Sequence, residues 1–315
     1  MPCATISIDI DGIGCYHAIH GLPAAAGSDP MYSQAMPRFL DLVDSLRIKA
    51  TLFAVGRDVE APAAAGLLRR AVEAGHEVAN HSYAHDYRLT QQSAIEIESD
   101  LASAHRAIEA VTGIAPHGFR APGYNISDAV LDALESLGYR YDSSVFPAPG
   151  YFALRAAAIG FYRLRRQPSR SLVGDPRQFL APRRPYRPQL GKLFAAARGD
   201  QARRLIELPI AVATPVRLPY IGTYLAMAPD LLSAQLSRLA LREQAPINLE
   251  LHAIDFLDRS DAGVDPALAA RQRDLQVPAA AKIRRLRAAI GELAARRELL
   301  RLDDLALRSV IGTCG

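Results

Sequence analysis

Short apolar runs rich in β-branched residues alternate along this chain with longer segments in which apolar residues recur at the period of a helix. Residues 5–10 form the first run, residues 39–46 follow with a helical pattern, and residues 50–55 form the second run. This alternation favours a parallel sheet with helices outside it, either a barrel or a doubly wound sheet. Further strands are expected at residues 77–80, 118–119, 139–143, 205–209, 247–252 and 299–302, and further helices at residues 63–73, 92–111, 128–137, 230–242 and 280–296.

The size and composition of the chain suit a folded α/β protein. Its 315 residues are 50% hydrophobic and 22% charged, which excludes a disordered or fibrous chain. Three scattered cysteines, Cys3, Cys15 and Cys314, form neither a disulfide framework nor a Cys-x-x-Cys metal site and favour a reducing compartment. The N-terminus lacks a signal-peptide pattern, and no run approaches the ~18 apolar residues of a membrane-spanning helix. We therefore expect a cytoplasmic protein without a transmembrane segment.

Basic residues are concentrated in one internal stretch. Residues 151–204 contain 13 Arg and Lys but only two acidic residues, Asp175 and Asp200, which gives a local net charge of +11. The rest of the chain sums to −7. Such asymmetry is typical of a specialised insertion rather than of a general affinity for polyanions.

The first part of this stretch, residues 151–166, is an apolar segment that ends in a cluster of arginines, Arg163, Arg165 and Arg166. Two interpretations remain open. The segment is either a lid helix with its arginines in water, or a contact with anionic lipid or a sugar phosphate. Nucleic acid is not expected as a partner, because no basic platform interleaved with aromatic residues is evident.

Acidic and imidazole side chains follow two of the expected strands, at the strand ends where functional groups of parallel α/β folds collect. The first strand ends in Asp9 and Asp11, and the strand period of two puts both carboxylates on one face. Two such acids are costly to bring together unless a cation lies between them or one is protonated. His81 and His85 follow the strand at residues 77–80, and one helical turn would bring them to the same side.

Two further strand ends carry polar groups. Arg120 begins a turn that offers a guanidinium and exposed backbone N–H groups, and Glu250 and His252 share one face of a later strand. Each feature alone has an ordinary explanation, such as a helix cap, a surface charge or a hydrogen-bonded histidine. Together, two imidazoles and one carboxylate form the three-ligand set of catalytic zinc sites. One acid, one histidine and one arginine remain, and these are the groups needed for metal-assisted hydrolysis of an amide or ester.

With these motifs in this order, the chain resembles the polysaccharide deacetylase family with NodB homology, the family-4 carbohydrate esterases. The resemblance spans residues 6–258. It implies a distorted (β/α) barrel, here with a basic helical and loop insertion, and one divalent metal ion, zinc or else cobalt, nickel or manganese. The matching motifs are the Asp-x-Asp pair, the His-x-x-x-His pair, Arg120 with Pro122 as Arg-x-Pro, and the late strand that ends at His252.

The resemblance also implies a role for each motif. Asp11, His81 and His85 would bind the metal, and Asp9 would act as the base. If the register of the Asp-x-Asp motif differs, the roles of Asp9 and Asp11 exchange. The bound ion would lower the pKa of water from ~15.7 toward ~7, which agrees with hydrolysis of an N-acyl group.

Four other residues have roles in this scheme. His252 would protonate the leaving amine, and Arg120 would hold Asp9 in place and ionised. A backbone N–H near Gly123 or Tyr124 would stabilise the oxyanion. Asp142 is assigned to the orientation of His252, with a buried turn-capping role as its alternative.

The chain departs from the family pattern in three places. The usual adjacent acid pair is Asp-Ile-Asp here, and the tryptophan common in the fourth motif is missing, because the chain has no Trp. Glu250 stands where relatives often have an apolar residue beside the acetyl methyl group. Either the acyl pocket differs, or Glu250 pairs with His252 or with the product amine.

We expect a single deacetylase domain over residues 1–315, with the basic insertion at about 148–204 and a C-terminal helix plus strand at about 279–303. The expected activity is hydrolysis of the carbon–nitrogen amide bond of an N-acylated amino sugar, by deacetylation of a lipid-linked or nucleotide-linked glycan precursor. The alternatives are deformylation of a lipid-linked formamido sugar and a catalytically silent carbohydrate-binding barrel. The expected location is the cytoplasm, with peripheral contact at the inner face of the membrane through residues 151–204.

Overall fold

The computed structural model describes residues 2–24, 27–164 and 172–311. Within these residues the main sheet has eight strands, all paired in parallel, in the order β11-β1-β2-β3-β4-β5-β8, with β12 also paired to β1. Its strands are β1 (Cys3–Ile10), β2 (Thr51–Ala54), β3 (Glu77–Asn80), β4 (Gly118–Phe119), β5 (Tyr141–Asp142), β8 (Ile206–Glu207), β11 (Ile247–His252) and β12 (Glu298–Leu300).

The sheet curls until its two edges approach each other. Beyond the end of β8, the backbone N–H of Ala211 donates a hydrogen bond of 3.0 Å to the carbonyl of Asn248 in β11. β1 pairs with β11, β12 and β2 and is buried along its whole length, as expected for a strand covered on both faces. The curled parallel sheet with helices outside it confirms the predicted distorted (β/α) barrel.

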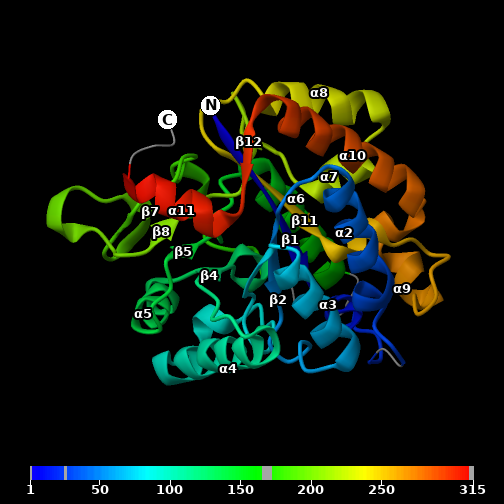
Figure 1. The fold of residues 1–315 in the computed structure, drawn as a ribbon, viewed down its shortest axis with the longest axis horizontal. Helices are drawn as coiled ribbons and strands as arrows, with labels where there is room; N and C mark the ends of the chain where they lie inside the picture. The colour runs from blue at the N-terminus through cyan, green and yellow to red at the C-terminus, as the bar shows by residue number, and fades with distance from the viewer. Residues whose placement is uncertain (1, 25–26, 165–171, 312–315) are drawn as a thin grey trace.

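Helices surround the sheet on its outer side (Figure 1). Helices α2, α3 and α10 lie near β1 and β2, whereas α4 and α5 pack against each other beside β3 and β4. The largest apolar cluster joins Ile6 and Ile8 of β1 to residues of these helices, such as Phe39 and Leu286. The helices are α1 (Ile13–Ile19), α2 (Met36–Ser45), α3 (Pro62–Glu73), α4 (Ala94–Thr112), α5 (Asp128–Ser136), α6 (Pro149–Leu164), α7 (Gly222–Met227), α8 (Asp230–Ala240), α9 (Pro266–Arg271), α10 (Ala279–Arg296) and α11 (Leu302–Ile311).

Local capping signals fix several of these helices. Ser93 Oγ accepts from the backbone N–H of Glu96, and the Glu96 carboxylate accepts from the backbone N–H of Ser93, which completes a capping box at the start of α4. Ser127 caps α5, and Gly138 follows its end with a φ of 78°, which a residue without Cβ adopts at little cost. The strands predicted at residues 77–80, 118–119 and 247–252 are present at those residues, and α4 and α5 lie close to their predicted bounds of 92–111 and 128–137.

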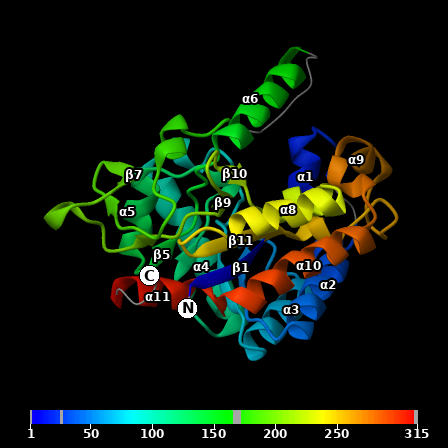
Figure 2. The ribbon, with the colours of Figure 1, turned by 90° about the horizontal axis from the view of Figure 1, so that it is seen from above.

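The basic insertion contains one long helix and a small hairpin. Helix α6 projects from the body of the molecule (Figure 2). Near its N-terminal end, Phe152 packs against Phe146 and Phe179. The helix predicted in this segment is present up to Leu164, whereas Arg165 and Arg166 lie outside the described residues. Two antiparallel pairs complete the region, β6 (Pro188–Gln189) with β7 (Lys192–Ala196) and β9 (Val212–Ala213) with β10 (Leu218–Pro219).

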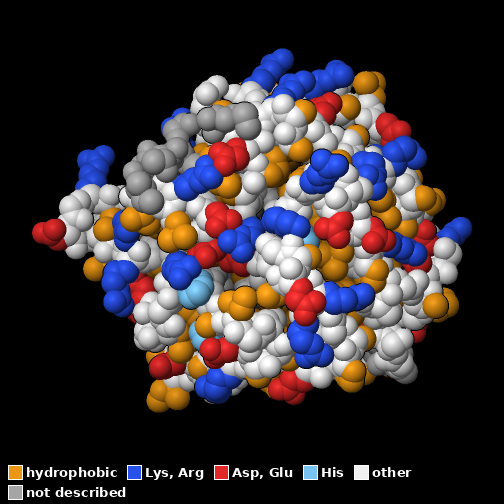
Figure 3. All heavy atoms as spheres, in the orientation of Figure 1, with side chains coloured by type: hydrophobic (Ala, Val, Ile, Leu, Met, Phe, Trp, Pro, Cys, Tyr) orange, Lys and Arg blue, Asp and Glu red, His pale blue; other side chains and the backbone are white. Residues whose placement is uncertain are grey.

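Among the described residues, no helix has the length and apolar character needed to cross a membrane. On the face shown in Figure 3, basic and acidic side chains are interspersed among apolar and uncharged ones. That mixture is typical of an ordinary solvated surface.

Candidate metal centre and active site

The carboxyl ends of neighbouring parallel strands place the candidate residues at one end of the barrel. Asp9 pairs with His252 across β1 and β11, and with Phe53 across β1 and β2. The next strand, β3, ends at Asn80, immediately before His81. Because all these strands run in the same direction, residues distant in the sequence meet at one edge of the sheet.

Asp11, His81 and His85 form a compact group of possible metal ligands. The Oδ1 atom of Asp11 lies 3.2 Å from Nε2 of His81 and 3.0 Å from Nε2 of His85. One ligand atom from each of the three buried residues lies within 4.8 Å of the others. Asp11 Oδ1 and both nitrogens of His85 have no hydrogen-bond partner within the described part of the chain. Such buried, unsatisfied donor atoms fit a metal ion, because two imidazoles and a carboxylate are a common zinc ligand set.

The orientation of His81 is fixed from outside the group. Its Nδ1 atom lies 2.7 Å from the carbonyl oxygen of Arg120, to which it donates a hydrogen bond in the tautomer that frees Nε2. Histidine ligands in metal sites characteristically donate their second N–H to such an acceptor. The turn after β4 therefore orients a side chain that follows β3.

The segment that carries the two histidines is not a helical turn, so that part of the prediction is wrong. Ser82 has a φ of 63° and His85 a φ of 50°, both in the left-handed region. Side chains stabilise this loop: Asn80 Oδ1 accepts from the amide of Ser82, and Ser82 Oγ accepts from the amide of His85. The Asp100 carboxylate accepts from two further amides of the loop. The two imidazoles converge because these bonds hold an irregular backbone.

Electrostatics within the group favour an ionised carboxylate. Burial acts to raise the pKa of Asp11, but the adjacent His85 and His81 hold it well below its usual value. Burial acts to lower the pKa of His85, but Asp11 raises it well above its usual value. Without a metal, His85 therefore retains a proton that a metal ion has to displace.

Asp9 forms an ion pair with Arg120 instead of joining the metal ligands. The Nη1 atom of Arg120 lies 2.7 Å from Oδ1 of Asp9, and both side chains are buried. The guanidinium also donates to Ser143 and Ser7, and it stacks over the ring of Phe53 at 4.2 Å. This environment keeps Asp9 beside the candidate metal ligands, with Oδ2 at 3.8 Å from Nε2 of His81.

His252 and Glu250 are brought together at the end of β11. Nε2 of His252 lies 3.2 Å from Oε1 of Glu250, and the His252 side chain is 20% exposed. Burial raises the pKa of Glu250 to about 7. Burial acts to lower the pKa of His252, but Glu250 and Asp9 raise it to about 9. Of the three possibilities that the sequence left open for Glu250, the structure has the pairing with His252.

Asp142 does not contact His252 within the described residues. Its Oδ1 atom accepts a hydrogen bond of 2.6 Å from Ser144, and it lies opposite Glu207 across β5 and β8. The structure therefore has Asp142 in the barrel wall, in the structural role that was its alternative. The period of two along β11 was the sequence signal that pointed to Glu250 as the neighbour of His252.

The turn after β4 carries the predicted oxyanion donors. Tyr124 donates its backbone N–H to the carbonyl of Ala121, which leaves Gly123 as the candidate of the two. Gly123 has a φ of 61°, and a Cβ there would come within 2.4 Å of Tyr87. Helix α6 covers this turn, because Arg155 donates to the carbonyl of Gly123 at 3.0 Å.

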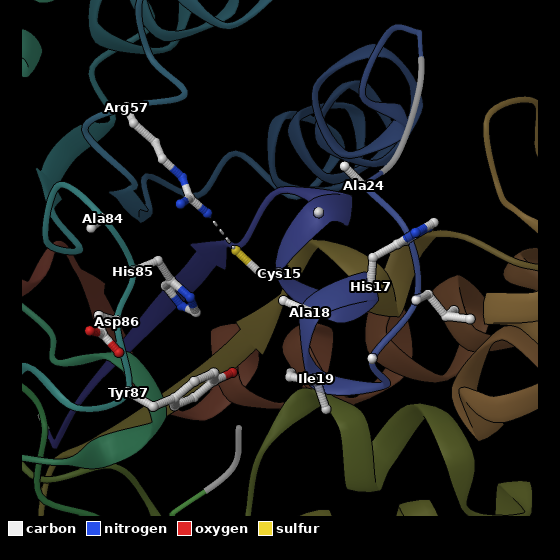
Figure 4. Close-up of a pocket in the computed structure, with 13 residues that line it drawn as sticks. Cys15, His17, Ala18, Ile19, Ala24, Arg57, Ala84, His85, Asp86 and Tyr87 are labelled. Carbon is white, nitrogen blue, oxygen red and sulfur yellow. Dashed lines mark hydrogen bonds between the residues drawn. The ribbon is translucent and has the colours of Figure 1, made fainter. Parts of the chain in front are cut away.

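A cavity of about 800 Å³ is lined by His85, one of the three candidate metal ligands (Figure 4). His85 and Tyr87 lie on one wall, and helix α1 lies on the opposite wall with Cys15. Nη2 of Arg57 lies 3.5 Å from the Cys15 sulfur at the rim. The cavity is large enough for a sugar and its neighbouring group beside His85.

Comparisons with known proteins agree with this architecture. The family model described as polysaccharide deacetylase matches residues 27–141. Over 110 residues the chain is 32% identical to a peptidoglycan deacetylase of Helicobacter pylori, covering 35% of this chain and 36% of that protein. Over 114 residues it is 32% identical to a peptidoglycan-N-acetylglucosamine deacetylase of Bacillus cereus, covering 36% of this chain and 50% of that protein. The chain thus matches half or less of the length of these relatives.

A solved structure shows the same fold over nearly the whole chain. The crystal structure from Mycobacterium smegmatis, described as a polysaccharide deacetylase, superposes with a TM-score of 0.60 and 17% sequence identity. The superposition covers 99% of this chain and 91% of that one. The distorted barrel therefore extends beyond the matched residues 27–141.

Proposed function

We propose that this chain, which matches the polysaccharide deacetylase family model over residues 27–141, is a metal-dependent N-deacetylase of an amino sugar in a glycan or glycolipid precursor. The observation that carries the proposal is the convergence of two groups at one end of the barrel. Asp11, His81 and His85 form a ligand set, and Asp9 and His252 lie beside it as spare proton-transfer groups.

One divalent ion, preferably zinc, would be held by Asp11, His81 and His85. When bound, it would supply Lewis acidity and lower the pKa of water toward ~7. Asp9 then accepts a proton from the water that attacks the acyl carbon. Arg120 holds the Asp9 carboxylate in place for that purpose, because its buried guanidinium lies 2.7 Å from the carboxylate.

The leaving nitrogen needs a proton, because an amide anion is too basic to leave. His252 supplies it. A pKa of about 9 keeps the imidazole protonated at neutral pH, as an acid requires. The N–H of Gly123 stabilises the charge that develops on the acyl oxygen.

The substrate that we propose is an intracellular precursor, lipid-linked or nucleotide-linked, and the proposed location is the cytoplasm with peripheral contact at an anionic membrane. The net charge of +11 over residues 151–204 supports this contact, together with the projecting helix α6 and its Leu154, which is 65% exposed. Fractionation of cells at low and high salt tests the location. Recovery from the extracellular fraction would contradict it.

A deformylase is the second candidate, because Glu250 and the Tyr124 hydroxyl make a polar wall in the barrel. Such a wall suits a formyl group better than an acetyl methyl group.

Product analysis distinguishes these candidates. Purified protein is supplied with zinc, cobalt, nickel or manganese and given a panel of lipid-linked and nucleotide-linked N-acetyl and N-formyl sugars, and acetate and formate are measured. Metal-dependent acetate release is the expected result. Formate release alone would establish the deformylase. Release of neither product with any metal would leave a carbohydrate-binding barrel and contradict the proposal.

A further inference from the structure

Glu250 is a fully buried carboxylate within strand β11. It lies between Leu249 and Leu251 on β11 and has no exposed surface. The alternation of the strand points it to the same side as His252. Burying an ionised carboxylate costs free energy unless a hydrogen-bond donor or a cation compensates its charge. Glu250 therefore needs such a partner.

The contacts of Glu250 are specific. Its Oε1 atom accepts a hydrogen bond of 2.8 Å from the hydroxyl of Tyr124 and lies 3.2 Å from Nε2 of His252. Its Oε2 atom is buried and has no hydrogen-bond partner in the described parts of the chain. The neutral hydroxyl of Tyr124 does not compensate the buried negative charge of Glu250, whereas a protonated His252 does.

We propose that Glu250 is the positioning residue of the acid His252. Its carboxylate holds the imidazole ring toward the reacting nitrogen and stabilises the protonated form. This inference rests on the proposed hydrolysis of an N-acyl sugar. In that step the carbon–nitrogen bond breaks, its electron pair takes the proton of His252, and a neutral imidazole remains beside the Glu250 carboxylate.

Other charged groups near His252 do not replace Glu250. Asp9 and Asp11 of the β1 end and Asp255 of the following turn also favour the charged imidazole, but Glu250 has the largest effect among the acids. Asp9 is already neutralised by Arg120. Burial alone would lower the pKa of His252, so loss of the Glu250 charge should lower it from about 9.

The test compares Glu250→Gln and Glu250→Asp with Glu207→Gln. Glu207 is a matched control, because it is equally buried in the barrel wall but lies against Asp142 and the amide of Val145 rather than against His252. Folding of each variant is checked by circular dichroism and thermal unfolding, and metal content by elemental analysis.

We expect Glu250→Gln to lower kcat by about 10- to 100-fold, the usual cost of losing an orienting partner of this kind. KM and metal content should stay near wild type. The alkaline limb of the kcat profile should move to lower pH by one unit or more, and Glu250→Asp should restore part of the loss. Glu207→Gln should leave the alkaline limb where it is in the wild type.

An NMR titration of the His252 imidazole gives a readout that needs no turnover. The pKa of His252 should fall in Glu250→Gln and not in Glu207→Gln. An unchanged pKa of His252 in folded Glu250→Gln, or a loss of kcat without movement of the alkaline limb, would overturn the inference. Failure of the proposed function is recognised separately, because the wild-type protein itself would then release neither acetate nor formate.

Discussion

Arg120 and Asp9 form a buried ion pair, with Nη1 and Oδ1 2.7 Å apart, although they are 111 residues apart in the sequence. The guanidinium has no exposed surface and donates to Asp9, Ser7 and Ser143 at once. The strand ends of β1 and β4 are therefore joined by a charge pair inside the barrel. This pair holds Asp9 beside the candidate metal ligands, with Oδ2 at 3.8 Å from Nε2 of His81.

Replacement of Arg120 should destabilise the fold as well as the site. Arg120→Ala leaves a buried carboxylate unpaired, so the free energy of unfolding should fall by about 3–5 kcal/mol. The free energy of unfolding of Arg120→Lys should lie between those of Arg120→Ala and the wild type, because a single ammonium cannot reach all three partners of the guanidinium. Urea unfolding measures both. Equal stability of Arg120→Ala and wild type would show that the pair has no structural importance.

His81→Ala should lose both metal and activity, because it removes one of three ligands and the imidazole that Arg120 orients. Elemental analysis of the purified variant measures the metal. His105→Ala is the matched control, since His105 lies on α4 near Tyr139 and outside the ligand group. Full metal occupancy in His81→Ala would contradict the assigned site.

Asp9→Asn and His252→Ala should keep the metal while turnover falls by ~10² or more, the usual scale of general acid–base catalysis. Both residues lie outside the Asp11, His81 and His85 group and form, with Glu250, a second cluster of acidic and imidazole side chains. Steady-state kinetics with a fixed metal load measures the effect. A variant that turns over at the wild-type rate would exclude the role given to its residue.

Metal affinity should rise with pH through the neutral range. Asp11 holds the pKa of His85 well above its usual value, so His85 carries a proton at neutral pH that the metal displaces. Calorimetry in buffers of different ionisation enthalpy should show proton release on binding, and less of it at higher pH. Binding without proton release at pH 7 would contradict the charged state of His85.

Replacement of Arg163, Arg165 and Arg166 by Ser should weaken binding to anionic vesicles and raise KM for a lipid-linked substrate. Electrostatic docking is screened by salt, with a Debye length of ~8 Å at physiological ionic strength, so binding should fall as salt rises. Metal content and turnover of a short soluble N-acyl sugar should stay near wild type. Vesicle sedimentation measures the binding.

The control for this variant is a triple replacement of basic residues on the helices outside the sheet, Arg69, Arg70 and Arg106. It removes the same charge from another surface. If both triple variants sediment with vesicles as the wild type does, at low salt, α6 is better explained as a solvated lid.

Local sequence signals determined most of the secondary structure. Ser127 precedes the start of helix α5 and Gly138 follows its end, as the sequence predicts. The strands at residues 77–80 and 247–252 also lie where their apolar runs predict them. Both kinds of signal act over only a few residues. Helix α11 was missed. Its first residue, Leu302, is the end of the strand predicted at residues 299–302, whereas β12 ends at Leu300 and α11 begins at Leu302.

The sequence by itself also brought Asp9, Asp11, His81, His85, Arg120 and His252 into one site, because parallel strands put their carboxyl ends at the same edge of the sheet. The period of two also put Glu250 and His252 on one face of β11, but only the tertiary structure decided that Asp142 contacts other residues than His252. Asp142 and Glu250 both lie on strands of the same barrel, but the order of the strands turns Asp142 toward Glu207 and leaves Glu250 at 3.2 Å from the imidazole. Side-chain contacts across a curled sheet depend on strand order and register, and neither is encoded within one strand.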